Sequence, residues 1–182
     1  MVALANKEVD RWRNMSETSP DASQSLLEYW RSVGKHFSIS NMLSKVFHST
    51  MPWSSAFISW VFFKSGAKNQ FPYSASHSGY FQQAKSDRDN TKAPLRGFRL
   101  HEYIPKIGDL VVYSRESGAD YDTTGFFPSH GEVIVKVGKG FIEAVGGNVS
   151  NKVKKSTYST TPKGYLTNQE KNFFMVIQNN IK

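Results

Sequence analysis

Hydrophobic positions in the first half of the chain recur at the spacing of helices. A capping box at Asp21 and Gln24 is expected to open an amphipathic helix. Its apolar positions are Leu26, Leu27, Trp30, Val33 and Phe37. The apolar run over residues 53–66 has almost no polar face, so it predicts a central helix that is buried on several sides. Pro52 directly precedes this run, which places Ser54 near the helix N-terminus.

The pattern changes to short strands in the second half. A loop leads into a short helix that begins at Ser76 or Ser78, and a stretch interrupted by glycine and proline follows. Strands are then predicted at residues 109–113, 132–137, 141–145, 153–158 and 173–178. Residues 138–140 join two of them as a hairpin turn. Helices followed by an antiparallel sheet predict one α+β domain, with residues 1–50 as its N-terminal helical part and residues 51–182 as its core.

Composition and charge narrow the class of protein. The chain has 182 residues, 38% of them hydrophobic and 14% aromatic, which is enough for one well-packed core. Lys and Arg number 23 against 15 Asp and Glu, and the net charge of +8 favours anionic partners such as cell-wall polymers. No helix carries a basic stripe, so nucleic acid is not an expected partner. No apolar run has the length of a membrane span or of a signal peptide, so neither membrane insertion nor a cleaved signal peptide is expected.

Cysteine is absent, which excludes disulfides and a thiol nucleophile. The five histidines show no metal-ligand spacing, and neither a metal nor another cofactor is expected. His36, His48 and His101 fit surface or helix-end positions and are assigned no role. Asp109 precedes a strand and is interpreted as a turn residue that bonds nearby backbone N–H groups, rather than as a catalytic group.

Three polar residues stand where hydrolytic chemistry is expected. Ser54 opens the buried helix, His130 opens a strand, and Asn148 follows the next strand. A nucleophile at a helix N-terminus lies near free backbone N–H groups that can hold an oxyanion. An imidazole would serve as its general base, and a third side chain would orient the imidazole. Glu132 is a rival of Asn148 for the third position, and Ser54 also fits the purely structural role of an N-cap.

Further residues are candidates for substrate binding. His77, among small hydroxyl residues in a loop, would line the cleft or serve only as a hydrogen-bonded loop histidine. Trp53 and Glu132 are the other substrate-binding candidates. Residues 146–147, both glycine, are expected to turn at positive φ and aim Asn148 at the cleft, although an ordinary hairpin turn fits equally.

Four segments resemble the NlpC and CHAP amidase superfamily, which has a papain-like fold. PWSSAFISW is similar to its nucleophile helix, with Ser54 at the position of the usual cysteine. IGDLVVY resembles the family's Gly-Asp-Leu strand, SHGEVIV its histidine strand, and FIEAVGGN the strand that ends in a polar residue. The segments follow the family's order over residues 53–148. With FPYSASHSGYF and GGNVSNKV, the set is closest to an uncharacterised bacterial branch that has serine in place of the catalytic cysteine.

The resemblance implies a papain-like amidase or endopeptidase that cleaves amide bonds in peptidoglycan stem peptides. It implies Ser54 as nucleophile, His130 as base and Asn148 as orienting group, with residues 51–182 as the catalytic core. Because a serine hydroxyl needs concerted proton removal, an inactive peptidoglycan-binding module and a cysteine enzyme changed to serine stay open beside a native serine hydrolase. An acyltransferase or esterase with the same nucleophile also stays open, because acyl-enzyme chemistry does not dictate the acceptor.

A small basic hydrolase without a signal peptide also resembles an antibacterial effector or a phage lysis factor. An effector of this kind would be cytoplasmic in the producing cell and exported by a contact-dependent secretion system to act in the periplasm. Its expected partners are peptidoglycan and a cognate immunity protein.

Overall fold

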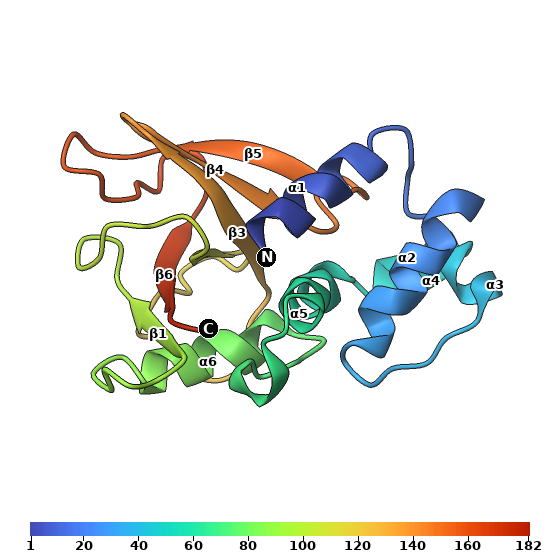
Figure 1. The fold of residues 1–182 in the computed structure, drawn as a ribbon, viewed down its shortest axis with the longest axis horizontal. Helices are drawn as coiled ribbons and strands as arrows, with labels where there is room; N and C mark the ends of the chain where they lie inside the picture. The colour runs from blue at the N-terminus through green and yellow to red at the C-terminus, as the bar shows by residue number, and fades with distance from the viewer.

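A six-stranded antiparallel sheet runs through the computed structural model, which describes residues 1–182 (Figure 1). The strands are β1 (Leu95–Phe98), β2 (Leu110–Ser114), β3 (Ser129–Gly138), β4 (Phe141–Gly146), β5 (Lys154–Ser159) and β6 (Phe173–Asn179). They lie in the order β1-β6-β2-β3-β4-β5, and all neighbours are antiparallel. The predicted antiparallel sheet is therefore confirmed, and β1 is an additional edge strand that the sequence pattern did not predict.

Six α-helices and one short 3-10 helix accompany the sheet. They are α1 (Val2–Arg11), α2 (Pro20–Arg31), α3 (Ile39–Met42), α4 (Lys45–Thr50), α5 (Ser54–Lys64) and α6 (His77–Ser86), with η1 (Lys68–Gln70) between the last two. Figure 1 shows α2, α3 and α4 gathered at the right of the view, with α5 between them and the sheet. The helix α1 packs on β3, β4 and β5, while α6 packs on β1 and β3. None of the helices combines the length and the apolar character needed to cross a membrane.

The start of α2 differs from the predicted capping box. Ser19 is the N-cap, and Pro20 is the first helical residue, where its fixed φ and missing N–H carry no penalty. Asp21 therefore lies in the first turn, near the positive end of the helix dipole, and forms no cap. The predicted apolar stripe is buried, with Leu26 and Trp30 in the core.

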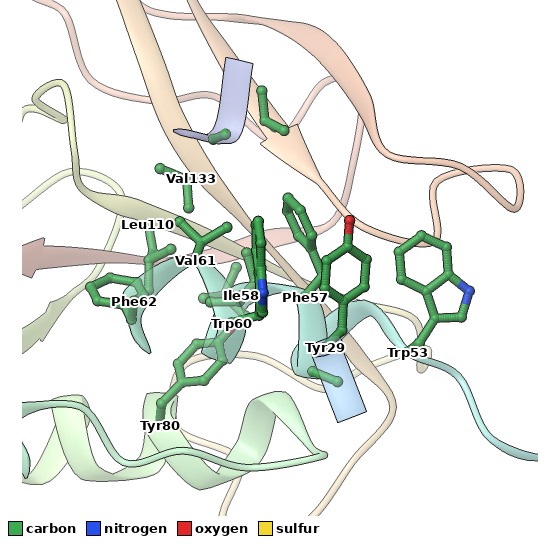
Figure 2. Close-up of a cluster of buried hydrophobic side chains, with 14 of the residues drawn as sticks. Tyr29, Trp53, Phe57, Ile58, Trp60, Val61, Phe62, Tyr80, Leu110 and Val133 are labelled. Atoms are coloured by element: carbon green, nitrogen blue, oxygen red, sulfur yellow. The ribbon is translucent and has the colours of Figure 1, made fainter. Parts of the chain in front are cut away.

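The core is built around α5, as the apolar run predicted. Every residue from Ser54 to Phe62 is buried, because α2 covers one side of the helix and β3 and β4 cover another. Figure 2 shows side chains of α5 among those of Tyr29 and Tyr80, which come from α2 and α6. The helix ends at Lys64, and Gly66 has a φ of +83°, the left-handed conformation that commonly follows a helix end.

Two turns fix the ends of the central strands. Asp109 accepts hydrogen bonds from the backbone N–H of Lys106 at 2.8 Å and from that of Asn179 at 3.0 Å. Its interpretation as a turn residue is therefore confirmed, and it also ties β6 to β2. The predicted hairpin between β3 and β4 is present, with Gly140 at a φ of +84°.

Candidate active site

Ser54 is the first residue of α5, and its hydroxyl does not cap the helix. The N-cap is Trp53, which provides no side-chain cap hydrogen bond. The N–H groups of the first turn, including those of Ser54 and Ser55, have no acceptor within the helix and form its positive end. The purely structural role of Ser54 as an N-cap is therefore wrong, and its hydroxyl is available for another partner.

That partner is His77, whose Nε2 lies 2.8 Å from Ser54 Oγ. His77 is the first residue of α6, and Ser76 caps the helix by accepting a hydrogen bond from the N–H of Ser78. The other ring nitrogen, Nδ1, is hydrogen-bonded to the hydroxyl of Tyr80, one turn further along α6. In the tautomer that donates Nδ1–H to Tyr80, Nε2 keeps its lone pair and accepts the Ser54 proton. A hydroxyl, an imidazole and a group that orients the imidazole are thus arranged as the activation of a serine nucleophile requires.

A pocket of about 240 Å³ leads to Ser54 and His77. Its lining residues are Pro52, Ser54, Ala75, Ser76, His77, Arg115, Phe126, Phe127, Pro128 and Ser129. Ser54 is 6% exposed and His77 is 4% exposed, and both line this pocket. A ligand in the pocket would meet the hydroxyl and the imidazole together.

His130 makes no hydrogen bond to Ser54 and has different partners. Its Nδ1 accepts a hydrogen bond from the Arg115 guanidinium at 3.1 Å, and its Nε2 lies 3.5 Å from Glu132 Oε1. Because a guanidinium only donates, Nδ1 must be the unprotonated nitrogen, and the ring proton sits on Nε2. The ring centroid of His130 lies 5.4 Å from that of His77. The position expected for His130 beside Ser54 is thus held by His77, because β3 directs His130 into the interior.

Burial sets the protonation of the three titratable groups in this cluster. It raises the pKa of Glu132 to about 8, and it lowers the pKa of His130 to about 3, with a further lowering by the charges of Arg115 and Lys171. Burial, His130 and Arg115 together hold the pKa of His77 well below its ordinary value. At neutral pH both imidazoles are therefore uncharged and Glu132 is mostly protonated. A neutral His77 is the form that can accept a proton.

Glu132 lies in the interior behind His130, not in the pocket. Its Oε1 accepts a hydrogen bond from the Tyr158 hydroxyl at 3.0 Å, while Oε2 has no hydrogen-bond partner. The carboxyl is fully buried. The structure therefore places Glu132 next to His130, as its rival role required, but away from the surface that a substrate would touch.

The glycines before Asn148 act by close approach and not by a special φ. Neither Gly146 nor Gly147 has a positive φ, so that prediction is wrong. A Cβ on Gly146 would lie 2.8 Å from His130 Nε2, and one on Gly147 would lie 2.5 Å from the Cβ of Phe57. It is Asn148 itself that takes the left-handed conformation, with a φ of 57°.

Three of the residues considered from the sequence do not line the pocket of Ser54 and His77. Asn148 lines a separate, wholly polar pocket beside Glu17 and His48. Trp53 is fully buried and donates its indole N–H to Glu17 at 2.9 Å, so its side chain points away from the pocket of Ser54 and His77. His48, expected at a surface or helix-end position, is in the last turn of α4 but is buried, with Nε2 bonded to the carbonyl of Met42.

A family model described as "Uncharacterized protein conserved in bacteria (DUF2272)" matches residues 12–177. The chain belongs to this family. No curated protein and no solved structure matches the chain. The DUF2272 match includes Ser54, His77, Tyr80 and Arg115, so the whole candidate site lies within the family's region.

The pattern of the sequence did not predict two residues of this candidate site in the DUF2272 protein, Tyr80 and Arg115. Tyr80 had a signal, because residues three apart on a helix share a face, and His77 precedes it by three. Arg115 had none, because it follows β2 in a loop and reaches the pocket only through the pairing of β2 with β3. His77 was considered either a cleft residue or a hydrogen-bonded loop histidine, and its contact with Ser54 was not predicted.

The free energy of unfolding of this DUF2272 protein should fall as the pH rises from 6.5 to 8. Glu132 has a pKa of about 8 in the folded chain against an ordinary 4.5, so the folded state keeps a proton that the unfolded state has lost. The expected slope is at most ~1.4 kcal/mol per pH unit. His77 and His130 have lowered pKa values, so their stabilising effect is lost only as the pH falls below 6.5.

Urea unfolding of Glu132→Gln at pH 6.5 and 8 checks this expectation. The variant should lose the decline in stability, because its amide does not titrate. Glu143→Gln is the matched control, since Glu143 lies on the neighbouring strand β4 and pairs with Lys136 and Lys155. It should keep the decline. An identical decline in Glu132→Gln would mean that Glu132 is not the protonated group.

Proposed function

We propose that this protein is a serine-dependent hydrolase of amide bonds in peptidoglycan stem peptides, built on the papain-like core of the NlpC and CHAP amidases. The observation that carries the proposal is the 2.8 Å contact between Ser54 Oγ and His77 Nε2 at the N-terminus of α5, beside a pocket. The residue roles differ from those expected from the resemblance. His77 takes the role of base and Tyr80 the role of orienting group.

The proposed reaction is acyl transfer through Ser54. The Ser54 oxygen bonds to the amide carbonyl carbon while its proton passes to His77 Nε2. His77 then gives this proton to the leaving amine as the C–N bond breaks. A water molecule then gives a proton to His77 and bonds to the acyl carbon. As the ester C–O bond breaks, His77 returns the proton to the Ser54 oxygen and the acid leaves. The free N–H groups of the first turn of α5 are the proposed donors to the oxyanion.

Two observations support peptidoglycan as the substrate. The segments that resemble NlpC and CHAP amidases include the helix that carries Ser54. The net charge of +8 favours approach to the anionic polymers of a bacterial cell wall. The proposal extends to an antibacterial effector that acts in the periplasm and is neutralised by an immunity protein in the producing cell. Directing the protein to the periplasm of a test bacterium should then cause lysis, and normal growth would count against the effector role.

Ser54 stands at the position of the cysteine of NlpC and CHAP amidases, and this difference favours a second candidate function. A protein that has lost the thiol can keep the ligand and lose the reaction, which would make this chain a peptidoglycan-binding module. An acyltransferase or esterase is a further alternative, because an acyl-enzyme does not dictate its acceptor. The masses of the products distinguish water from another acceptor.

Digestion of purified peptidoglycan tests the proposed function. Incubation should release peptides and create new amine termini, measured by amine labelling and mass spectrometry. Ser54→Ala should create none, whereas Ser65→Ala, which changes a serine at the opposite end of α5, should match the unmodified protein. Unchanged peptidoglycan would contradict hydrolysis, and binding retained in that case would support the binding module.

A further inference from the structure

Arg115 brings an uncompensated positive charge to the pocket of Ser54 and His77. It is an exposed residue directly after β2, and no carboxylate lies within 4 Å of its guanidinium. The residues that line the pocket include no Asp or Glu. The opening to the proposed nucleophile is therefore positively charged, and nothing within the pocket neutralises it.

The fold holds this guanidinium in place. The backbone N–H of Arg115 donates to the carbonyl of Pro128 at 2.8 Å, and its guanidinium donates to His130 Nδ1 at 3.1 Å. His130 is fully buried in β3, so it is a fixed acceptor. A neutral imidazole positions the guanidinium without cancelling its charge. Glu132, which lies behind His130, is mostly protonated at neutral pH and does not cancel it either.

The remaining donors of Arg115 suit a carboxylate. A guanidinium has five N–H donors in a planar fork, and the bond to His130 leaves most of them free for a bidentate contact. Phe126, Phe127 and Pro128 form an apolar wall of the same pocket. This wall adds no charge, so Arg115 is the only charged residue among those that line the pocket at neutral pH.

We propose that Arg115 is a specificity-determining residue that binds a free carboxylate of the substrate near the amide to be cut. The inference rests on the proposed function, and it narrows the substrate class to peptides with a free carboxylate next to that amide. It also assigns a role to His130, which becomes the positioning residue of Arg115. A role of Arg115 as an oxyanion donor is the competing explanation, and the two differ in measurable ways.

Binding to a protein that does not cut provides the first test. Ser54→Ala protein is titrated, by calorimetry, with two stem peptides of the same sequence, one with free carboxylates and one with every carboxylate amidated. The free acid should bind at least ~10-fold more tightly, the range expected for a charge-assisted contact. Adding Arg115→Gln should reduce its affinity to that of the amide, and Arg115→Lys, which keeps the charge but loses the fork, should fall between the two.

The control is Arg31→Gln at the end of α2, which changes the same net charge away from the pocket. It should leave the preference for the free acid intact. Melting curves of the Arg115 variants show whether each is folded. If Arg115→Gln does not fold, the comparison of the two peptides is made with Arg115→Lys. Equal affinity for the two peptides, or a loss in Arg115→Gln that is equal for both, would overturn the inference.

Kinetics with the unmodified Ser54 separate the two explanations. Arg115→Gln should raise KM at least ~10-fold for the free acid, with little change in kcat, because the lost contact exists before the reaction. A fall in kcat of equal size for both peptides would assign Arg115 to the oxyanion instead. Hydrolysis of both peptides without a preference for the free acid would overturn the inference and leave the proposed function standing. Preferred binding of the free acid without any hydrolysis would contradict the proposed function and leave the carboxylate contact of Arg115 standing.

Discussion

Replacing Ser54 with alanine should lower kcat/KM for stem-peptide hydrolysis by at least roughly 10³-fold and leave the fold intact. The hydroxyl has one hydrogen-bond partner, His77, and its removal leaves the helix and the apolar core unchanged. His77→Ala should cause a loss of similar size. Because the two groups act as a unit, the double variant should lose little more than either single variant. Steady-state rates with a labelled stem peptide, together with circular dichroism, measure both effects.

Histidine variants provide the control for this expectation. His101→Ala changes an exposed histidine outside the site and should retain the full rate. His130→Gln should weaken substrate binding through Arg115 more than it lowers kcat, because His130 contacts Arg115 and not Ser54. Loss of kcat in His130→Gln combined with full activity in His77→Ala would reverse the assignment and restore the strand histidine as base.

Replacing Phe57 with alanine should have the largest effect on stability, a loss of ~3 to 5 kcal/mol in the free energy of unfolding. Phe57 is fully buried on α5, with its ring 5.4 Å from that of Tyr29 and its Cβ close to Gly147. The surrounding elements α2, β3 and β4 cannot all move inward to fill the cavity. Urea unfolding followed by circular dichroism measures the loss.

Phe63 on the same helix is the matched control. Its side chain is 55% exposed, so Phe63→Ala removes the same atoms from a position that is largely in water. The change should be within ~1 kcal/mol. Losses of equal size at Phe57 and Phe63 would show that α5 is not the centre of the core.

The fold was largely predictable because its main elements have clear periods. Residues 53–66 have almost no polar face, and the strands from β2 to β6 each fall close to a predicted range. The edge strand β1 was missed because it has only four residues and includes Arg96 and Gly97, which give no strand signal. The start of α2 was misplaced by two residues, since Asp21 fits a cap as well as a first turn.

The candidate site was only partly predictable, because it depends on tertiary geometry. Sequence order suggested that Ser54 would meet the histidine that opens a strand, yet the helix α6 brings His77 to it instead. The sequence does not show which of the two rings, whose centroids lie 5.4 Å apart, reaches Ser54. Asn148 follows β4 as predicted, but its left-handed conformation accompanies a position in a different pocket.

The most direct test of a serine nucleophile activated by His77 is covalent labelling with a fluorophosphonate, which loses fluoride when a serine oxygen bonds to its phosphorus. Mass spectrometry of the digested protein locates the adduct. The expected result is one adduct, on Ser54, that does not form in His77→Ala and forms at the normal rate in His101→Ala. An unlabelled Ser54, or equal labelling with and without the His77 imidazole, would contradict it.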